Sequence, residues 1–221
     1  MIKRISAIFS LLMIIGLVPA LLIPTLHAGA DAKTAAPYII PALRGKTQKF
    51  AYDPLHTQVF FTIDHLGFTT VRGRFNSFKG TFTIDTLHPE RSRADFTIDA
   101  NSVDLNSAIW DKHTEEDFLG TDKYPEISFK STKIVQTGPK TARMTGDLTL
   151  HGVTQPVTLD VTLSKIATNT IQSPRVDAGF HVTGTIKRSD FGITKYLSLI
   201  GDDVGIDVWV DGFYQPFKLN K

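Results

Sequence analysis

Apolar and polar residues alternate, with a tight break at the centre, through residues 146 to 163, GDLTLHGVTQPVTLDVTL. Successive side chains of a β-strand point to opposite faces, so this spacing predicts two strands that each have one dry face. The break, HGVTQP, carries turn-forming residues. The dry faces must be covered, either by neighbouring strands or by something that the protein carries.

The same alternation recurs along most of the chain from Phe50 onward and predicts eight strands. Turn-rich segments such as LHPERS, QTGPKT and IQSPR separate them and are mostly too short for crossover helices, which indicates antiparallel neighbours. Only residues 107–119, SAIWDKHTEEDFL, have a helical pattern, with a second short turn near KYLSLI. The predicted strands cover residues 59–65, 78–84, 94–100, 127–129, 142–150, 157–163, 180–186 and 204–210.

So little helix means that the dry faces must cover one another, in a closed barrel or in a sandwich. An eight-stranded barrel is just wide enough to be filled by side chains or to hold one small ligand. Small residues on the inward faces favour an open lumen. The alternative is that inward glycines only allow the sheet to coil. These small residues are Gly80, Ala94, Ala100, Ala142, Gly146 and Gly184.

The first thirty residues have the order of a secretory signal peptide. Lys3 and Arg4 precede an apolar run, and A-x-A sites predict cleavage after Ala30 or Ala32. The alternative is an uncleaved inner-membrane anchor, since the run from Ile5 to Ile23 approaches the roughly 20 residues that span a bilayer. We therefore expect a signal peptide (1–30), a linker or N-terminal arm (31–49) and one barrel domain (50–221).

Composition narrows the class of protein further. The 221 residues are 42% hydrophobic and 21% charged, which fits one globular domain with a tail. Removing Lys3 and Arg4 lowers the formal net charge from +2 to zero, so a nucleic-acid partner is not expected. An exported chain without cysteine relies on its core and sheet hydrogen bonds, and suits a bacterial periplasm.

Four segments in order resemble the YceI-like family: YDPLHTQVFFTIDHLGFTTVRGRFNSFKGTF (52–82), DFLGTDKYPEISFKST (117–132), GDLTLHGVTQPVTLDV (146–161) and KRSDFGI (187–193). The resemblance implies a periplasmic, lipocalin-like protein whose extended eight-stranded antiparallel barrel, with a short capping helix, holds a long isoprenoid or other lipidic chain. It implies no family-wide catalysis. It also suggests a quinone-like ligand and a cytochrome b561-type membrane protein as partner.

One segment departs from the family pattern. Many members carry Arg-Asp-x-His, followed five residues after the histidine by Asp-Phe. This chain has WDKHTEEDF, with Trp110 in place of the arginine and Asp117 only four residues after His113. The departure implies a shorter helical mouth and weakens any headgroup contact inferred there.

Several polar side chains have two interpretations. His65 continues the inward parity of its strand. It is either a ligand contact or a core histidine that is hydrogen-bonded to a carbonyl group. Trp110 and His113 share a helical spacing, and their segment closes one end of the barrel. The two side chains either contact a ligand headgroup or belong to a simple hydrophobic plug. Arg188 faces an anionic headgroup or bonds the neighbouring turn. The full set of residues expected to line the ligand site is Phe61, Ile63, His65, Phe82, Ile84, Phe96, Ile98, Trp110, His113, Phe118, Phe129, Met144, Gly146, Leu148, Gly184, Ile186 and Arg188.

The sequence lacks the parts of common enzymes. It has no G-x-S-x-G elbow, no cysteine nucleophile and no H-E-x-x-H spacing, so we expect neither covalent hydrolysis nor a metal site. The DFG triplet has no kinase motifs around it. We expect a binding protein for a lipidic small molecule, without a cofactor. The rivals are an enzyme acting on a lipid headgroup, with His65 or His113 as general base beside Asp111 or Asp117, and a structural envelope protein with a filled core.

Trp209 and Tyr214 lie on or near the outward parity of the last strand. An N-terminal arm or a second subunit of a homodimer could cover them.

Overall fold

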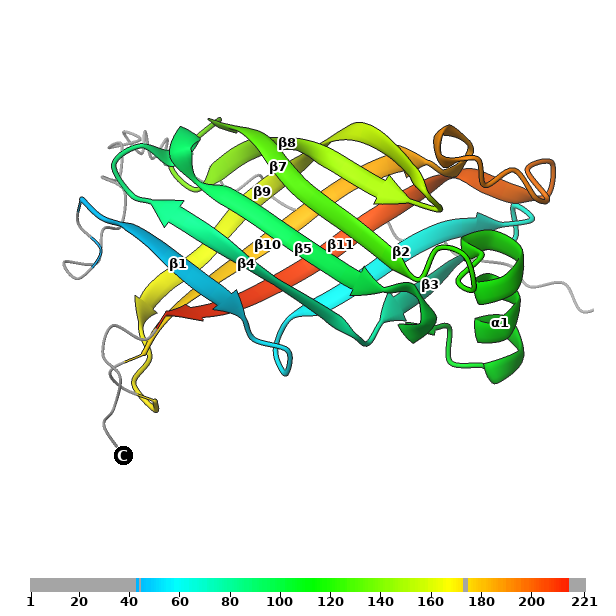
Figure 1. Cartoon of the computed structure of the whole chain (residues 1–221), viewed down its shortest axis with the longest axis horizontal. Helices are drawn as coiled ribbons and strands as arrows, with labels where there is room; N and C mark the ends of the chain where they lie inside the picture. Colours follow the sequence, from blue (N-terminus) through cyan, green and yellow to red (C-terminus); the bar gives the residue numbers. More distant parts are fainter. Residues whose placement is uncertain (1–42, 44, 173–174, 215–221) are drawn as a thin grey trace, which may run out of the picture. The chain divides into compact units, whose positions relative to one another are not determined.

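The computed structural model describes residues 43, 45–172 and 175–214 and consists mainly of β-strands (Figure 1). The strands are β1 (Thr47–Tyr52), β2 (Gln58–His65), β3 (Thr69–Phe75), β4 (Phe78–Asp85), β5 (Arg93–Asp99), β6 (Val103–Asp104), β7 (Glu126–Gln136), β8 (Thr141–Leu150), β9 (Val153–Thr168), β10 (Val176–Lys187) and β11 (Ile200–Tyr214). The helical elements are α1 (Ala108–His113), which continues into the π-helical turn η4 (Thr114–Leu119), and the 3-10 turns η2 (Pro89–Arg91), η3 (Ala100–Ser102) and η5 (Arg188–Phe191).

The strands close into one antiparallel barrel with eight strand positions, which confirms the predicted fold class. Three positions are each filled by two successive segments. β1 and β2 both pair with β11, and β4 and β3 pair with β1 and β2 in turn. β5 and β6 pair with β4 and β3. From there β5, β7, β8, β9, β10 and β11 follow one another, so each of the eight positions lies beside the positions that precede and follow it in the sequence.

The stretch 146–163 forms the hairpin that its alternation predicts. β8 and β9 pair in register from Leu150 opposite Val153 back to Thr141 opposite Thr162. His151 and Gly152 connect them, and both have positive φ values, 52° and 75°. Positive φ at both central residues is the geometry of a type I′ turn, which matches the twist of the strands that it joins.

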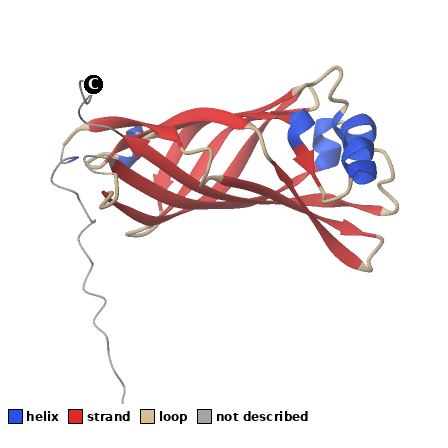
Figure 2. Ribbon diagram, turned by 90° about the horizontal axis from the view of Figure 1, so that it is seen from below, coloured by secondary structure: helices blue, strands red, loops and turns tan. Residues whose placement is uncertain are grey.

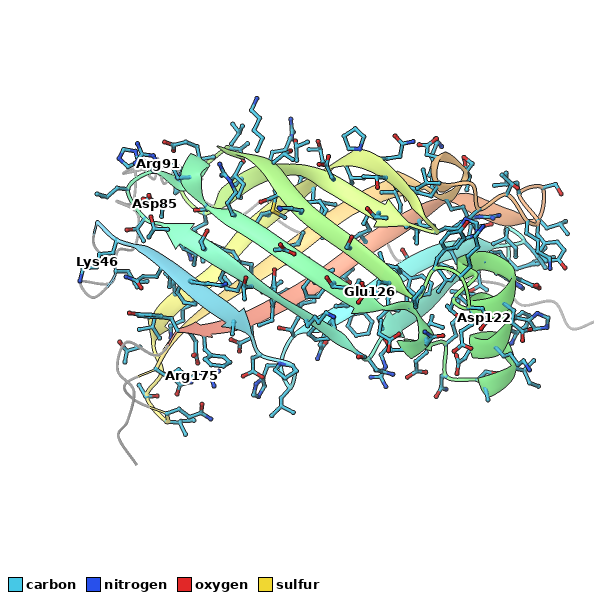
Figure 3. All side chains as sticks on the ribbon, in the orientation of Figure 1. Lys46, Asp85, Arg91, Asp122, Glu126 and Arg175 are labelled. Atoms are coloured by element: carbon cyan, nitrogen blue, oxygen red, sulfur yellow. The ribbon has the colours of Figure 1, made fainter. Side chains whose placement is uncertain are left out.

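The helical elements of residues 107–119 lie at one end of the barrel, as predicted (Figure 2). Ser107 precedes α1, and Gly120 ends the helical segment in the left-handed conformation, with φ of 57°. Glycine adopts this conformation without a steric penalty. Asp122 and Glu126 lie at this end, whereas Lys46, Asp85 and Arg91 lie at the other (Figure 3).

Three strand segments, β1, β3 and β6, are absent from the sequence prediction. The alternation does not predict β3, because its inward row is Val71, Gly73 and Phe75, and the glycine hides the apolar period. The ring of Phe61, its direct partner in β2, covers Gly73. β1 begins at Thr47, so residues 47–49, which we expected in the linker, belong to the barrel.

Side chains at the break between β1 and β2 form a buried ionic cluster. Arg175, just before β10, donates to Asp53 over 2.9 Å and also bonds Asp177. Burial raises the pKa of Asp53, but hydrogen bonds from Arg175, the Leu55 N–H and His56 outweigh it and lower the pKa to about 2. Thr57 donates to the Asp211 carbonyl over 2.8 Å. The cluster therefore fastens the β1–β2 break to β10 and β11.

The predicted signal peptide, residues 1–30, lies outside the described residues, as does most of the predicted linker. No helix among the residues that the structure describes is long and apolar enough to cross a membrane.

Candidate functional site: the apolar lumen of the barrel

The barrel interior contains two cavities, one of about 530 Å³ toward α1 and one of about 550 Å³ toward the other end. Both lie within the range of roughly 300–1,000 Å³ typical of small-molecule sites. Five residues line both cavities and mark their junction. These are Tyr52, Ala94, Met144, Val182 and Val210. The barrel therefore has an elongated lumen rather than a filled core.

The first cavity is lined by inward side chains from β2, β3, β5, β7 to β11 and the helical segment. Apolar residues make up nearly all of this lining. Most residues that the sequence predicted for the site belong to it. They are Phe61, Ile63, His65, Phe96, Ile98, Trp110, Phe118, Phe129, Met144, Leu148, Ile186 and Arg188.

The second cavity is lined by the predicted residues Phe82 and Ile84 and, like the first, by Met144. Its outer end is more polar, because Arg93 at the start of β5 and Lys140 in the β7–β8 connection line it. Asp85, also in the lining, accepts hydrogen bonds from the N–H groups of His88 and Leu87, which hold the pKa of its carboxyl below its usual range. This carboxylate is therefore committed to the local turn.

Gly146 and Gly184 point inward but line neither cavity. This corrects the prediction that both residues line the ligand site. A Cβ atom on Gly146 would meet the ring of Phe129 and would stand 2.6 Å from the Lys130 carbonyl. At Gly184 the same atom would stand 2.5 Å from the Leu159 side chain. The glycines leave space that neighbouring side chains occupy by lying flat against the wall. The open volume lies beyond those side chains.

The mouth of the first cavity lies between the end of β2 and α1. Trp110 lines the cavity and is 55% exposed, so the cavity reaches the surface beside it. The ring of His65 meets the ring of Trp110 edge-on, with centroids 6.2 Å apart. His65 thus faces the lumen near its strand end, as predicted, and its contact with a ligand stays a prediction.

His113 lies outside the lining of both cavities, contrary to expectation. Its Nδ1 atom is 3.2 Å from Asp117 on the outer side of the helical segment. Lys195 also contacts Asp117, at 2.5 Å, and with His113 it lowers the pKa of that carboxyl. Asp111 accepts from the Leu105 N–H over 2.6 Å. Of the residues in the enzyme alternative, Asp111, His113 and Asp117 are therefore engaged outside the cavity lining, whereas His65, the other candidate base, lines the first cavity.

Arg188 is buried and binds the loop between β10 and β11. Its guanidinium donates to the carbonyl oxygens of Gly201, Ile193, Lys195 and Ile200 over 2.8 to 2.9 Å. Burial lowers its pKa from the usual value, and Asp202 partly opposes that effect. The turn-bonding interpretation is the one that the structure shows.

Tyr52 and Ala94 occupy the junction of the two cavities. The predicted set of ligand-site residues contains neither, although Ala94 was among the small inward residues that favoured an open lumen. The ring of Tyr52 packs edge-on against Phe96, at 4.7 Å between centroids, and against Phe82 at 5.3 Å. Burial, together with the charge of Asp95, raises the pKa of the Tyr52 phenol, which keeps it neutral. The alternation signalled that Ala94 faces inward, but only the structure shows that it lines both cavities, as does Tyr52 two strands away in β1.

A closed antiparallel barrel with an elongated apolar lumen defines a lipocalin-like class of protein. The sequence matches the YceI-like domain family over residues 50–211, and this chain belongs to that family. A UPF0312 protein of Pectobacterium atrosepticum is 40% identical over 168 residues, which cover 76% of this chain and 86% of that protein. Protein YceI of Shigella flexneri is 41% identical over 161 residues, covering 72% and 83%.

Solved structures share the fold. The crystal structure of BcnA from Burkholderia cenocepacia matches with a TM-score of 0.66 at 25% identity, covering 72% of this chain and 98% of that one. The YceI protein of Campylobacter jejuni matches with a TM-score of 0.62 at 29% identity, covering 69% and 90%. A polyisoprenoid binding domain from Saccharophagus degradans matches with a TM-score of 0.55 at 16% identity, covering 77% of this chain and all of that one, and so shares the fold.

Proposed function

We propose that this protein is a periplasmic binding protein that holds one long apolar molecule, an isoprenoid, a quinone-like compound or another lipid, along the barrel lumen. The observation that carries the proposal is the pair of apolar cavities that meet end to end at Tyr52 and Ala94. Such a site suits an extended chain better than a compact ligand, because the two cavities lie end to end within one barrel.

The energetics favour a lipidic cargo. Each methylene that leaves water for an apolar site contributes roughly 0.8 kcal/mol, so a long chain gains affinity from its length alone. The polar groups in the lining are few, and Arg188 and Asp85 already have protein partners. The site therefore selects its ligand by shape and apolar character rather than by charge.

The Saccharophagus degradans protein that shares this fold is a polyisoprenoid binding domain, which supports an isoprenoid as the cargo. The order of charged and apolar residues before Ala30 supports export. The engagement of Asp111, His113 and Asp117 outside the lumen supports binding without catalysis.

Native mass spectrometry of protein purified from its own host tests the proposal. We expect a co-purifying lipidic molecule in stoichiometric amount that is unchanged after incubation. An empty barrel, or a ligand that is converted, would contradict this function.

A lumen-filling variant makes the test specific. Ala94→Phe places a ring at the junction of the two cavities and should abolish retention of a long chain. Thr97→Phe adds the same ring to β5 on the opposite, outward parity and should leave retention unchanged. Equal ligand content in the two folded variants would show that the cargo does not occupy the lumen.

A further inference from the structure

Large apolar side chains are exposed around the end of the barrel that carries α1. We define the apolar rim as Leu66 and Phe68 in the β2–β3 turn, Ile109 and Trp110 in α1, and Tyr196 and Leu199 in the β10–β11 loop. Phe68 is 89% exposed. Isolated exposed apolar residues are ordinary, but a group of six at one end marks an interaction surface.

The three segments that carry the apolar rim contact one another. The Leu66 N–H donates to the Leu199 carbonyl over 3.1 Å, which joins the β2–β3 turn to the β10–β11 loop. Trp110 contacts His65, the residue before Leu66, and Tyr196 packs on Phe118, with ring centroids 6.2 Å apart in each pair. The apolar rim is therefore one surface, at the helical end in Figure 2.

The apolar rim is continuous with the lumen. Trp110 belongs to both the rim and the lining of the first cavity, and Ile200, in the same lining, directly follows Leu199. A chain that left the first cavity at its mouth would pass between apolar side chains.

Two rim residues occupy unfavourable backbone conformations. Leu66 and Tyr196 have φ values of 59° and 57°, in the left-handed region where glycine or asparagine costs less. Neither side chain is buried to offset that cost. Stability of the fold alone therefore does not account for these residues.

We propose that the apolar rim docks on the surface of a lipid bilayer, so that the mouth of the first cavity opens among acyl chains and the cargo enters without crossing water. This inference rests on the proposed function, because a lipidic cargo resides in such a bilayer. Tryptophan and tyrosine, which combine an apolar ring with a polar tip, suit the interface between headgroups and acyl chains.

Charge at this end selects the kind of bilayer. The helical segment carries Asp111, Glu115, Glu116 and Asp117 against Lys112, and the β10–β11 loop adds Lys195, which pairs with Asp117. Attraction to anionic headgroups is therefore not the driving force, and burial of apolar side chains is. Docking should proceed on zwitterionic phosphatidylcholine and should not weaken with added salt.

Two single-tryptophan probes of equal exposure test the orientation. Both are made in the full chain with Trp110→Phe and Trp209→Phe. One carries Phe68→Trp in the apolar rim. The other carries Ile171→Trp in the β9–β10 connection, where the native side chain is 91% exposed. Vesicles of phosphatidylcholine with brominated acyl chains should quench the rim probe strongly and the β9–β10 probe little.

The probe positions control for two other routes of contact. Neither Phe68 nor Ile171 lines either of the two cavities, so a brominated lipid taken into the lumen does not mimic docking. The N-terminal apolar run is present in both probes, so any attachment that it provides acts equally on both. Equal quenching of the two probes, or none, would overturn the proposal.

A serine pair measures the strength of docking. Phe68→Ser with Ile109→Ser should weaken partition to phosphatidylcholine vesicles by about tenfold or more, the scale of two apolar side chains that lose burial. The matched pair Leu55→Ser with Ile171→Ser removes equally exposed apolar side chains elsewhere and should change partition little. Equal effects of the two pairs would contradict docking through the apolar rim.

Ligand content separates this inference from the proposed function. If the protein co-purifies with a lipidic molecule but the rim probe is not quenched, the docking surface is wrong and the cargo assignment stands. If the rim probe is quenched but no ligand is found, the docking surface stands and the cargo assignment is wrong.

Discussion

The ring of Phe129 lies over Gly146, where it fills the space that a side chain on that glycine would need. The two residues belong to neighbouring strands, β7 and β8. The aromatic ring packs flat along the wall instead of projecting across the lumen, so the glycine keeps the lumen open through its neighbour.

We expect Gly146→Ala to destabilise the barrel, because the new methyl group collides with Phe129 and with the Lys130 backbone. Overpacking of this kind costs roughly 1–3 kcal/mol. Gly179→Ala is the matched control, since a Cβ atom there meets its nearest neighbour, Ser164, at an ordinary 3.7 Å. Urea unfolding midpoints should fall for the first variant and not for the second. Equal midpoints would mean that Phe129 moves freely.

Arg188 should be essential to the β10–β11 loop. Arg188→Met leaves four buried or part-buried carbonyl hydrogen bonds unmade and should cost about 3–5 kcal/mol. Arg188→Lys should rescue little, because an ammonium lacks the planar fork that reaches four oxygens. Lys187→Met is the neighbouring control, since it removes an exposed ion pair with Asp203 worth at most about 1 kcal/mol. Denaturant unfolding, with amide exchange over residues 188–200, measures the difference. Protection of the loop in Arg188→Met would be inconsistent with this role.

Asp53 should make stability sensitive to acid. Its pKa in the folded state is lowered to about 2, below the usual value of about 3.9 in an unfolded chain. Its contribution is therefore fully present above the unfolded pKa and is lost as the pH falls toward 2. We expect Asp53→Asn to be less stable by roughly 1–3 kcal/mol at pH 7.

The same variant should converge with the parent protein as the pH falls below about 2, because Asp53 is protonated in both folded and unfolded chains only below its folded pKa. Asp160→Asn is the control, because that exposed carboxylate is 3.7 Å from Arg143 in a surface pair. Chemical denaturation at several pH values gives both curves. A difference between Asp53→Asn and the parent that does not change with pH would rule out the ionic cluster as its source.

Trp110 should slow the exchange of cargo, because its ring stands at the mouth beside His65. Trp110→Ala should speed release of a fluorescent isoprenoid analogue by roughly 2- to 10-fold, the worth of one aromatic contact. Trp209→Ala is the control, since Trp209 stacks on His181 on the outer wall, with ring centroids 3.9 Å apart. Equal release rates in the two variants would place the exit elsewhere.

The helical pattern of residues 107–119 predicted the capping helix. Alternation predicted antiparallel strands with one buried face, because burial on one face leaves a period of two in the sequence, but it left the choice between a barrel and a sandwich open. It missed β3 because a cross-strand ring, Phe61, supplies the bulk that Gly73 lacks. Parity likewise predicted most of the lumen lining. It could not identify Tyr52 and Ala94 as the junction, since parity shows which residues face inward but not how far each cavity extends along the barrel.

Other features leave no periodic signal. His113 shares a helical spacing with Trp110, but the π-helical turn that follows α1 and the contact with Asp117 keep it outside the lumen. The exposure of Phe68 in the β2–β3 turn and of Ile109 in α1 leaves no periodic signal, because a pattern of apolar residues alone would place both in the core. The choice between the two roles of Arg188 required the path of the loop after β10.

Pairing of β1 and β2 with β11 also sets the order in which this protein can mature. The first and last strands of the barrel close it, so no enclosed lumen exists until residues 200–214 have paired with β1 and β2. Until then the chain is a sheet with two unpaired edges and an exposed apolar face, the state in which such chains aggregate. Truncation of the last strand should therefore abolish folding as a whole rather than produce a smaller barrel.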